Sequence, residues 1–190
     1  MAEHKVLIEV SARHIHLSAE HLEALFGKGA ELHVYKKISQ PNQFAAVEKV
    51  TLVGPKGKLD LRVVGPLRSE TQAELSVSDC RTLGLPVVLR VSGNLADTAG
   101  AIIEGPQGKV ELKQGVIVAQ RHLHINPKQA ALFGLKHGDV VSVKTNSTRP
   151  VTFHDVFVRS REGVDEMSFM IDTDEANAAG INSGEEGIII

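Results

Sequence analysis

The chain has 190 residues, enough to bury one larger core or two small ones. Its net charge of −2 and its aromatic content of only 4% argue against nucleic acid as a partner, because neither a basic field nor stacking platforms are present. The single cysteine, Cys80, rules out an internal disulfide and fits a reducing cytosol. No apolar run reaches membrane-spanning length, so we expect no membrane partner.

Short segments rich in Val, Ile and Leu recur along the chain between Gly, Pro or Asn residues, which predicts β-strands. Gly54-Pro55-Lys56-Gly57 and Gly105-Pro106-Gln107-Gly108 place Pro second and Gly fourth, as type I turns do, and each predicts a hairpin. The predicted strands cover residues 5–10, 49–53, 58–64, 87–91, 101–104, 110–112, 116–119, 140–144, 156–158 and 188–190.

Four short helices are predicted between these strands. Ser18 can cap a helix that runs to Phe26, and Asn126 can cap another that Pro127 opens and Gly134 closes. Two further helices are predicted at residues 79–83 and 174–179. We therefore predict a mainly β protein, one or two small β-barrels with short capping α-helices. No Pro/Ser-rich linker occurs, so two barrels would be closely packed.

The chain contains an internal repeat of one short motif. Arg13-His14-Ile15-His16-Leu17-Ser18 matches Arg121-His122-Leu123-His124-Ile125-Asn126, and each block runs into a short predicted helix ending in Leu-Phe-Gly. The duplication suggests pseudo-symmetry, with the two His-x-His pairs meeting at an interface.

His-x-His is a metal-binding pattern because residues i and i+2 of a strand point to the same side, so two imidazoles can hold one ion. One such pair could equally be surface or hydrogen-bonded histidines, but two pairs in matching contexts favour a metal site. Zinc suits imidazole and carboxylate ligands. The candidate carboxylates are Glu74, Asp155, Asp172 and Asp174.

The polar stretch 65–76 is either an active-site loop or a solvated loop between strands. Its Arg68 is a candidate clamp for phosphate or carboxylate, although any single arginine can also be a surface charge. Strand alternation should direct Arg13 and Arg121 away from the metal side, where they would be structural or bind a polyanion. Cys80 is expected to be a structural residue, and the histidines at positions 4, 21, 33 and 137 are expected to lie at the surface without a functional role.

Taken together, residues 10–18, 65–76, 90–93, 120–124 and 171–179 make the chain resemble the PduL-type phosphate propanoyltransferases. These phosphotransacylases are associated with propanediol utilisation and bacterial microcompartments. The resemblance implies a central barrel over residues 12–119 and a second barrel from residues 1–11 with 120–190. It also implies that one zinc is held by His14, His16 and Glu74, that a second is held by His122 and His124, and that Arg68 meets phosphate.

The chain departs from the family pattern in one ligand position. The family has histidine immediately before the Ile-Asp-Thr-Asp-Glu segment, where this chain has Met170. Thioether is a poor zinc ligand, so the second site would be weak, empty or completed by another residue, for which His154 is a candidate. The sequence also begins almost at the first strand, without a microcompartment-targeting extension, which predicts a cytoplasmic protein.

The resemblance predicts an enzyme that interconverts acyl-CoA plus phosphate with acyl phosphate plus CoA, for short propanoyl or acetyl chains. We expect one or two Zn²⁺ per chain, coenzyme A as a substrate and, as a further possibility, a homodimer. Two alternatives stay open. Residues 131–141 have the sequence pattern of double-psi β-barrels, a helix end followed by Gly and then by Gly-Asp-Val. This pattern would suit a degenerate, non-catalytic metal- or CoA-binding barrel protein. A metal-dependent thioester or phosphoester hydrolase is the other.

Overall fold

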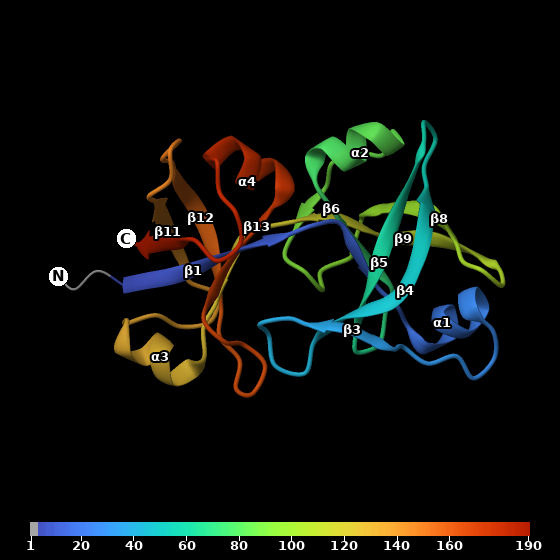
Figure 1. The fold of residues 1–190 in the computed structure, drawn as a ribbon, viewed down its shortest axis with the longest axis horizontal. Coiled ribbons are helices and arrows are strands. Elements are labelled where there is room, and N and C mark those ends of the chain that lie inside the picture. Colours follow the sequence, from blue (N-terminus) through green and yellow to red (C-terminus); the bar gives the residue numbers. More distant parts are fainter. Residues whose placement is uncertain (1–3) are drawn as a thin grey trace. The chain divides into compact units, whose positions relative to one another are not determined.

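The computed structural model describes residues 4–190, which divide into two compact units. The central unit comprises residues 13–38 and 42–119, and the terminal unit comprises residues 4–12, 39–41 and 120–190. Each unit contains its own hydrophobic core. Each is built around a ring of paired strands with short helices, shown in Figure 1.

The central unit closes as a six-stranded barrel, because β8 pairs with both β4 and β9. Two short strands, β3 (Val34–Lys37) and β7 (Leu89–Arg90), extend this sheet at its edges. The barrel strands, in ring order, are β4 (Phe44–Val53), β5 (Lys58–Gly65), β2 (His14–His16), β6 (Gln72–Leu75), β9 (Lys109–Ala119) and β8 (Ala99–Glu104).

The terminal unit is also a closed six-stranded barrel. Its first strand, β1, pairs in parallel with β13 and antiparallel with β14, so strands from both ends of the sequence close the ring (Figure 1). In ring order the strands are β1 (His4–Ser11), β13 (Ser168–Asp172), β10 (His122–His124), β12 (Thr152–Arg159), β11 (Val140–Thr145) and β14 (Glu186–Ile189).

Four short helices occur within residues 4–190: α1 (Ala19–Phe26), α2 (Val77–Leu83), α3 (Pro127–Leu132) and α4 (Thr173–Ala179). Together with the two rings, they confirm the prediction of a mainly β protein with small barrels and short helices. None of the helices in this described part is long and apolar enough to cross a membrane.

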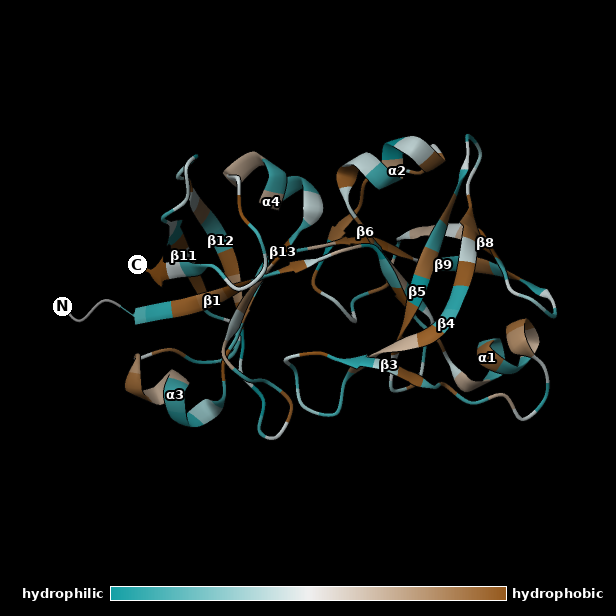
Figure 2. Ribbon diagram, in the orientation of Figure 1, coloured by the Kyte–Doolittle hydropathy of each residue, from teal (hydrophilic) through white to brown (hydrophobic). Residues whose placement is uncertain are grey.

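Alternation of apolar and polar residues explains why these segments form barrels. Along β5 the buried residues Leu61, Val63 and Gly65 alternate with less buried ones. Figure 2 shows hydrophilic and hydrophobic bands along this strand. The apolar faces turn inward to form the two cores. In the terminal unit, Phe169 is the largest fully buried side chain.

The two Gly-Pro-x-Gly turns form hairpins as predicted, and each also packs against a helix. Lys56 N–H donates to the Leu83 carbonyl of α2 at 2.9 Å, and Gln107 N–H donates to the Leu25 carbonyl of α1 at 2.9 Å. A Cβ atom at Gly54 or Gly105 would clash with the backbone of these helix ends. The glycines are therefore required by close approach as well as by the turns.

A three-residue segment between β3 and β4 belongs to the terminal unit. Its buried Gln40 donates from Nε2 to Ser168 Oγ at 2.9 Å and to the Glu166 carbonyl at 3.1 Å. Glu166 N–H donates back to Gln40 Oε1 at 3.1 Å. The side chain is thus satisfied on both of its polar atoms.

Several predicted element bounds were wrong. Residues 109–119 form one continuous strand, β9, where two were predicted, and the strand predicted at 87–91 is only β7. The second predicted helix begins at Val77, because Ser76 and Asp79 form a capping box two residues earlier than expected. The largest error concerns residues 65–76, since 72–75 are the fully buried strand β6 and not part of a polar loop.

Candidate active site

Two adjacent strands of the central unit carry the first set of candidate ligands. β2 runs antiparallel to β6, with His14 opposite Glu74 and His16 opposite Gln72. Between them, Ile15 and its cross-strand neighbour Ala73 are fully buried in the core. Because successive strand residues point to opposite faces, the histidines and Glu74 share the other face.

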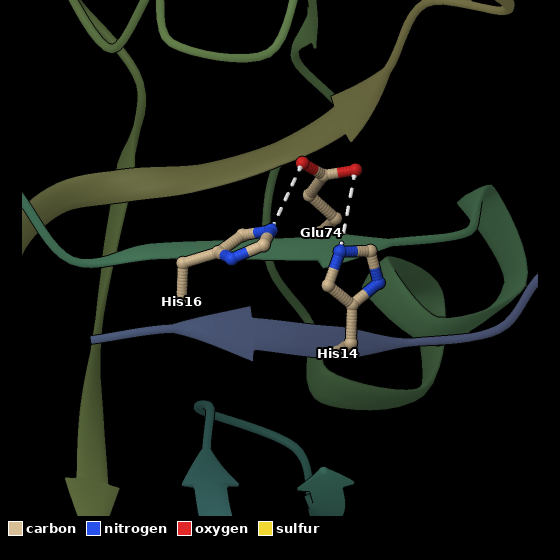
Figure 3. Close-up of side chains that lie close together, drawn as sticks. All are labelled: His14, His16 and Glu74. Carbon is tan, nitrogen blue, oxygen red and sulfur yellow. Dashed lines mark ion pairs between the residues drawn. The ribbon is translucent and has the colours of Figure 1, made fainter. Parts of the chain in front are cut away.

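The three predicted ligands of the first site converge there, as Figure 3 shows. His14 Nε2 lies 3.7 Å from Glu74 Oε2, and His16 Nε2 lies 3.9 Å from Glu74 Oε1. The two imidazole rings are nearly perpendicular, with centroids 5.0 Å apart. Over residues 4–190 this is the one group of three or more His, Cys, Asp or Glu side chains whose ligand atoms lie within 4.8 Å of one another.

His16 is held in the form that can bind a cation. Its Nδ1 lies 2.9 Å from the Val64 carbonyl, which can only accept, so Nδ1 carries the proton. Burial, followed by electrostatic interaction with His14 and Arg68, lowers the pKa of His16 well below its usual value. The ring is therefore neutral near pH 7, and its Nε2 lone pair faces the Glu74 carboxylate.

Arg68 reaches the same place from the loop before β6. Its backbone N–H donates to the Leu17 carbonyl at 2.9 Å, and its guanidinium Nη1 donates to Ser92 Oγ at 3.4 Å. Ser92 Oγ donates in turn to Glu74 Oε1 at 2.9 Å. The structure thus brings Arg68 to the ligand group through Ser92, a residue for which sequence reasoning assigned no role.

Gln72 is the second residue that sequence reasoning missed. Its side chain is buried and donates from Nε2 to Glu74 Oε1 at 2.6 Å. The signal was present in the sequence, because Gln72 and Glu74 are spaced i, i+2 and must share a face if they lie on a strand. Treating the segment as a loop hid that pattern.

The second histidine pair lies in the terminal unit, on β10. This strand runs antiparallel to β13, with His122 opposite Met170 and His124 opposite Ser168. Both histidines are buried, and their Nε2 atoms are 3.0 Å apart. The ring centroids are 4.7 Å apart with planes inclined at 75°, close to the arrangement of the first pair.

Both Nδ1 atoms of this pair donate hydrogen bonds to oxygen atoms. His122 Nδ1 lies 2.9 Å from the Gln120 carbonyl, and His124 Nδ1 lies 2.6 Å from Asp165 Oδ1. Burial lowers the pKa of His124, and its hydrogen bond to Asp165 offsets this only in part. When both rings are neutral, two Nε2 lone pairs face each other at 3.0 Å, an arrangement that favours a shared cation.

Asp165 anchors this second pair. Burial alone would raise the pKa of Asp165, but hydrogen bonds from His124 and Arg161 outweigh it and hold the pKa well below its ordinary range. Arg161 donates to both carboxylate oxygens, from Nε at 2.9 Å and from Nη2 at 3.1 Å. The carboxylate therefore acts as an acceptor that orients His124.

The hydrogen bonds of Asp165 predict a stability effect. Replacing Asp165 with asparagine should lower the free energy of unfolding by about 2 kcal/mol, because hydrogen bonds to a charged, buried group are lost. Urea unfolding followed by circular dichroism at pH 7 measures the change. Glu162→Gln, which removes an exposed carboxylate from the same loop, is the matched control. Equal stability of the two variants would contradict the prediction.

The two histidine pairs occupy equivalent places in duplicated structures. β2 and β10 each have a parallel neighbour, β5 or β12, and an antiparallel neighbour, β6 or β13. Glu74 and Met170 face the first histidine of their pairs, and each stands two residues before the N-cap of a helix with a capping box. Met170 is therefore the structural counterpart of the candidate ligand Glu74.

The arginines before the pairs are also equivalent. Arg13 Nε bonds to Asp79 Oδ1 at 2.9 Å, and Arg121 Nη1 lies 3.3 Å from Glu175 Oε1. Asp79 and Glu175 are the third residues of α2 and α4 and complete their capping boxes. Both arginines thus make ion pairs with helix caps, and binding of a polyanion by them stays a prediction.

The remaining candidates lie elsewhere. His154 is exposed and its Nδ1 lies 2.8 Å from Ser142 Oγ, so it does not form a three-ligand group with the second pair. Asp172 is the N-cap of α4, and its carboxylate accepts from Glu175 N–H. His21, expected at the surface, is half-buried and its Nδ1 lies 2.7 Å from Thr71 Oγ1. Cys80 is buried in α2, as expected of a structural thiol.

Comparison with known proteins places this arrangement in a family. A family model described as phosphate propanoyltransferase matches residues 7–182. The chain belongs to the phosphate propanoyltransferase family. It is 47% identical over 184 residues to a phosphate propanoyltransferase of Leptotrichia buccalis, covering 96% of this chain and 87% of that protein.

Other members of the phosphate propanoyltransferase family are equally similar. The Thermotoga maritima protein of that name is 48% identical over 182 residues, covering 95% of this chain and 86% of the relative. The one from Rhodopseudomonas palustris is 53% identical over 176 residues, covering 92% and 77%. Membership makes the chain an acyltransferase and confirms the resemblance found in its motifs.

Proposed function

We propose that this acyltransferase moves a short acyl group, propanoyl or acetyl, reversibly between coenzyme A and phosphate, with a divalent metal at His14, His16 and Glu74. The observation that carries the proposal is the juxtaposition of this three-ligand group with Arg68, joined through Ser92. Membership of the phosphate propanoyltransferase family supplies the reaction class.

The donor set of the first site fits zinc. Two imidazoles and one carboxylate form a three-ligand set that is common in catalytic zinc sites, where a fourth position is open. The neutral, Nδ1-protonated His16 directs a lone pair into the group, which supports binding of a cation there. A bound metal would supply a Lewis acid for the thioester carbonyl and a partner for the departing thiolate.

The side chains of the chain itself account for the rest of the chemistry. Arg68 can bind phosphate and hold one of its oxygens against the acyl carbon, because a guanidinium matches phosphate oxygens in pairs. In the forward direction an oxygen of hydrogen phosphate forms a bond to the acyl carbon and the carbon–sulfur bond breaks. CoA leaves as a thiolate, which takes up the proton that the phosphate gives up. Phosphate is itself the nucleophile, so no serine or cysteine nucleophile is required.

The second pair, His122 and His124, is proposed as a weaker metal site. It offers two Nε2 donors, and the position equivalent to Glu74 is occupied by the thioether of Met170. Zinc prefers imidazole or carboxylate to thioether, so two good ligands alone should bind it less tightly than the complete first site. That both pairs serve one reaction centre stays a prediction.

The reaction itself is tested by its dependence on phosphate. Zinc-loaded protein should release free CoA thiol from propanoyl-CoA only when inorganic phosphate is present, with acyl phosphate formed in equal amount. Thiol release that does not depend on phosphate would indicate a hydrolase. Metal retention without any thiol release would indicate a binding protein. Either outcome would contradict the proposal.

Replacing Arg68 tests its assigned role. Arg68→Ala should raise KM for phosphate by about 10- to 100-fold, the usual effect of removing a hydrogen bond to a charged group, while KM for propanoyl-CoA changes little. Arg68→Lys should recover part of the loss, since lysine keeps the charge but not the paired geometry. Arg81→Ala, which removes an exposed arginine of α2, is the control. Initial rates at varied phosphate measure the effect, and an unchanged KM would rule out phosphate binding by Arg68.

A further inference from the structure

A short chain of hydrogen bonds connects Glu74 to Arg68 and is not explained by the ligand group alone. Glu74 Oε1 accepts from Gln72 Nε2 at 2.6 Å and from Ser92 Oγ at 2.9 Å. Ser92 Oγ also accepts from Gln72 Nε2 at 2.9 Å and from Arg68 Nη1 at 3.4 Å. One hydroxyl therefore touches both a candidate metal ligand and the candidate phosphate clamp.

Donor and acceptor types fix the direction of each bond. Gly93 N–H donates to Gln72 Oε1 at 2.8 Å, so the amide NH₂ of Gln72 is the end that faces Glu74 and Ser92. A carboxylate can only accept, so the single hydroxyl proton of Ser92 goes to Glu74. Both lone pairs of Ser92 Oγ are then taken up by Gln72 and Arg68. The proton and both lone pairs of the hydroxyl are therefore hydrogen-bonded, which fixes its orientation.

The fold explains why these two residues are in place. Gln72 and Glu74 lie on the same face of β6, opposite His16 and His14. Gln72 is only 1% exposed, and a buried amide must be hydrogen-bonded to be tolerated. Ser92 and Gly93 lie two and three residues after the end of β7, whose pairing with β9 holds them near the β6 face. Two separate segments thus support one carboxylate.

We infer that Gln72 and Ser92 are positioning residues that fix the Glu74 carboxylate and couple it to Arg68. The inference rests on the proposed function, in which Glu74 binds metal and Arg68 binds phosphate. Residues that orient a metal ligand commonly change metal affinity by about 10- to 100-fold when they are lost. Because Ser92 touches both groups, it links the two affinities, whereas Gln72 acts mainly on the carboxylate.

The test compares Ser92→Ala, Ser92→Thr and Gln72→Leu in the full chain. Co²⁺ is used as the probe, with its affinity measured by chelator competition and its site reported by the visible absorption spectrum. Ser92→Ala should weaken Co²⁺ binding about tenfold and raise KM for phosphate about tenfold, with a smaller change in kcat. Gln72→Leu should weaken Co²⁺ binding by a similar factor but alter KM for phosphate less. Ser92→Thr keeps the hydroxyl and should restore both quantities.

Additivity gives a second criterion. Gln72 and Ser92 donate to the same oxygen, so the double variant should lose less Co²⁺ affinity than the product of the two single losses. Ser142→Ala, which removes a half-buried hydroxyl of the terminal unit, is the matched control and should behave as wild type. Circular dichroism verifies that each variant is folded.

The outcomes separate this inference from the proposed function. Wild-type Co²⁺ affinity and phosphate KM in a folded Ser92→Ala protein would overturn it, as would Ser92→Thr failing to differ from Ser92→Ala. If the unmodified protein transfers no acyl group, the proposed function fails, yet the Co²⁺ affinities and spectra still decide whether Gln72 and Ser92 position Glu74.

Discussion

Glu74→Gln is expected to abolish metal retention at the first site and to lower kcat/KM by roughly a thousandfold. The amide keeps the shape of the side chain but loses the negative charge that balances a divalent cation between two neutral imidazoles. A bound metal contributes several kcal/mol to stabilising charge in the transition state, and each 1.36 kcal/mol is about a tenfold change in rate. Metal content after dialysis and phosphate-dependent thiol release measure the two effects.

Glu70→Gln is the matched control for this variant. Glu70 lies in the same segment as Glu74 but is exposed, so its replacement should leave metal content and rate unchanged. Circular dichroism would show whether the loss in Glu74→Gln reflects the site and not unfolding. A folded Glu74→Gln protein with full metal content and full activity would refute the assignment of Glu74 as a ligand.

Met170→His is expected to create a second strong metal site. Met170 faces His122 directly across the antiparallel pair β10–β13, and directly opposite residues have Cβ atoms about 4.5–5.5 Å apart. An imidazole there would join the facing Nε2 atoms of His122 and His124. Metal content should rise from about one to about two per chain. The metal affinity of this site should increase by at least about 10- to 100-fold, which is the effect of changing a residue that only orients a metal ligand. Elemental analysis and chelator competition provide the measurement.

Two controls make this result specific. Met170→Leu conserves volume without adding a donor and should keep the metal content of the wild type. The double variant Met170→His with His122→Ala should lose the gain, because one of the facing donors is gone. An unchanged metal content in Met170→His, or a gain that persists without His122, would show that the residue at position 170 does not complete this site.

Local patterns in the sequence predicted much of the fold. The Gly-Pro-x-Gly turns predicted the positions of two hairpins. Ser18 and Asn126 predicted where α1 and α3 begin, because their side chains accept a hydrogen bond from the backbone N–H of the third helix residue. The pattern failed for β6, whose Gln72 and Glu74 are polar yet buried. Periodicity identifies strands by their apolar side, and β6 has a polar face turned toward ligands and not toward water. The alternation of β6 covers only four residues inside a polar stretch, so the segment was predicted as a loop.

For the site, the repeated His-x-His pairs and Arg68 were visible in the sequence, and the structure brings Arg68 close to Glu74 and the first pair. The partners that orient them were not visible. Ser92 contacts Glu74 at a sequence separation of 18, and Asp165 contacts His124 at a separation of 41. Such contacts depend on the ring of strands and leave no local spacing to detect. The equivalence of Met170 with Glu74 likewise became evident only from the register of β13 against β10.

The position of β1 has a consequence for how the newly made chain folds. Every strand of the central barrel lies within residues 14–119, so this unit can close while the polypeptide is still being synthesised. β1, by contrast, pairs with β13 and β14, which are synthesised only after all the strands of the central barrel. Its apolar residues Val6 and Ile8 stay without their final partners until β13 and β14 have been made. The terminal barrel therefore depends on contacts of very long sequence separation, which makes it the slower unit to fold and the one more exposed to aggregation.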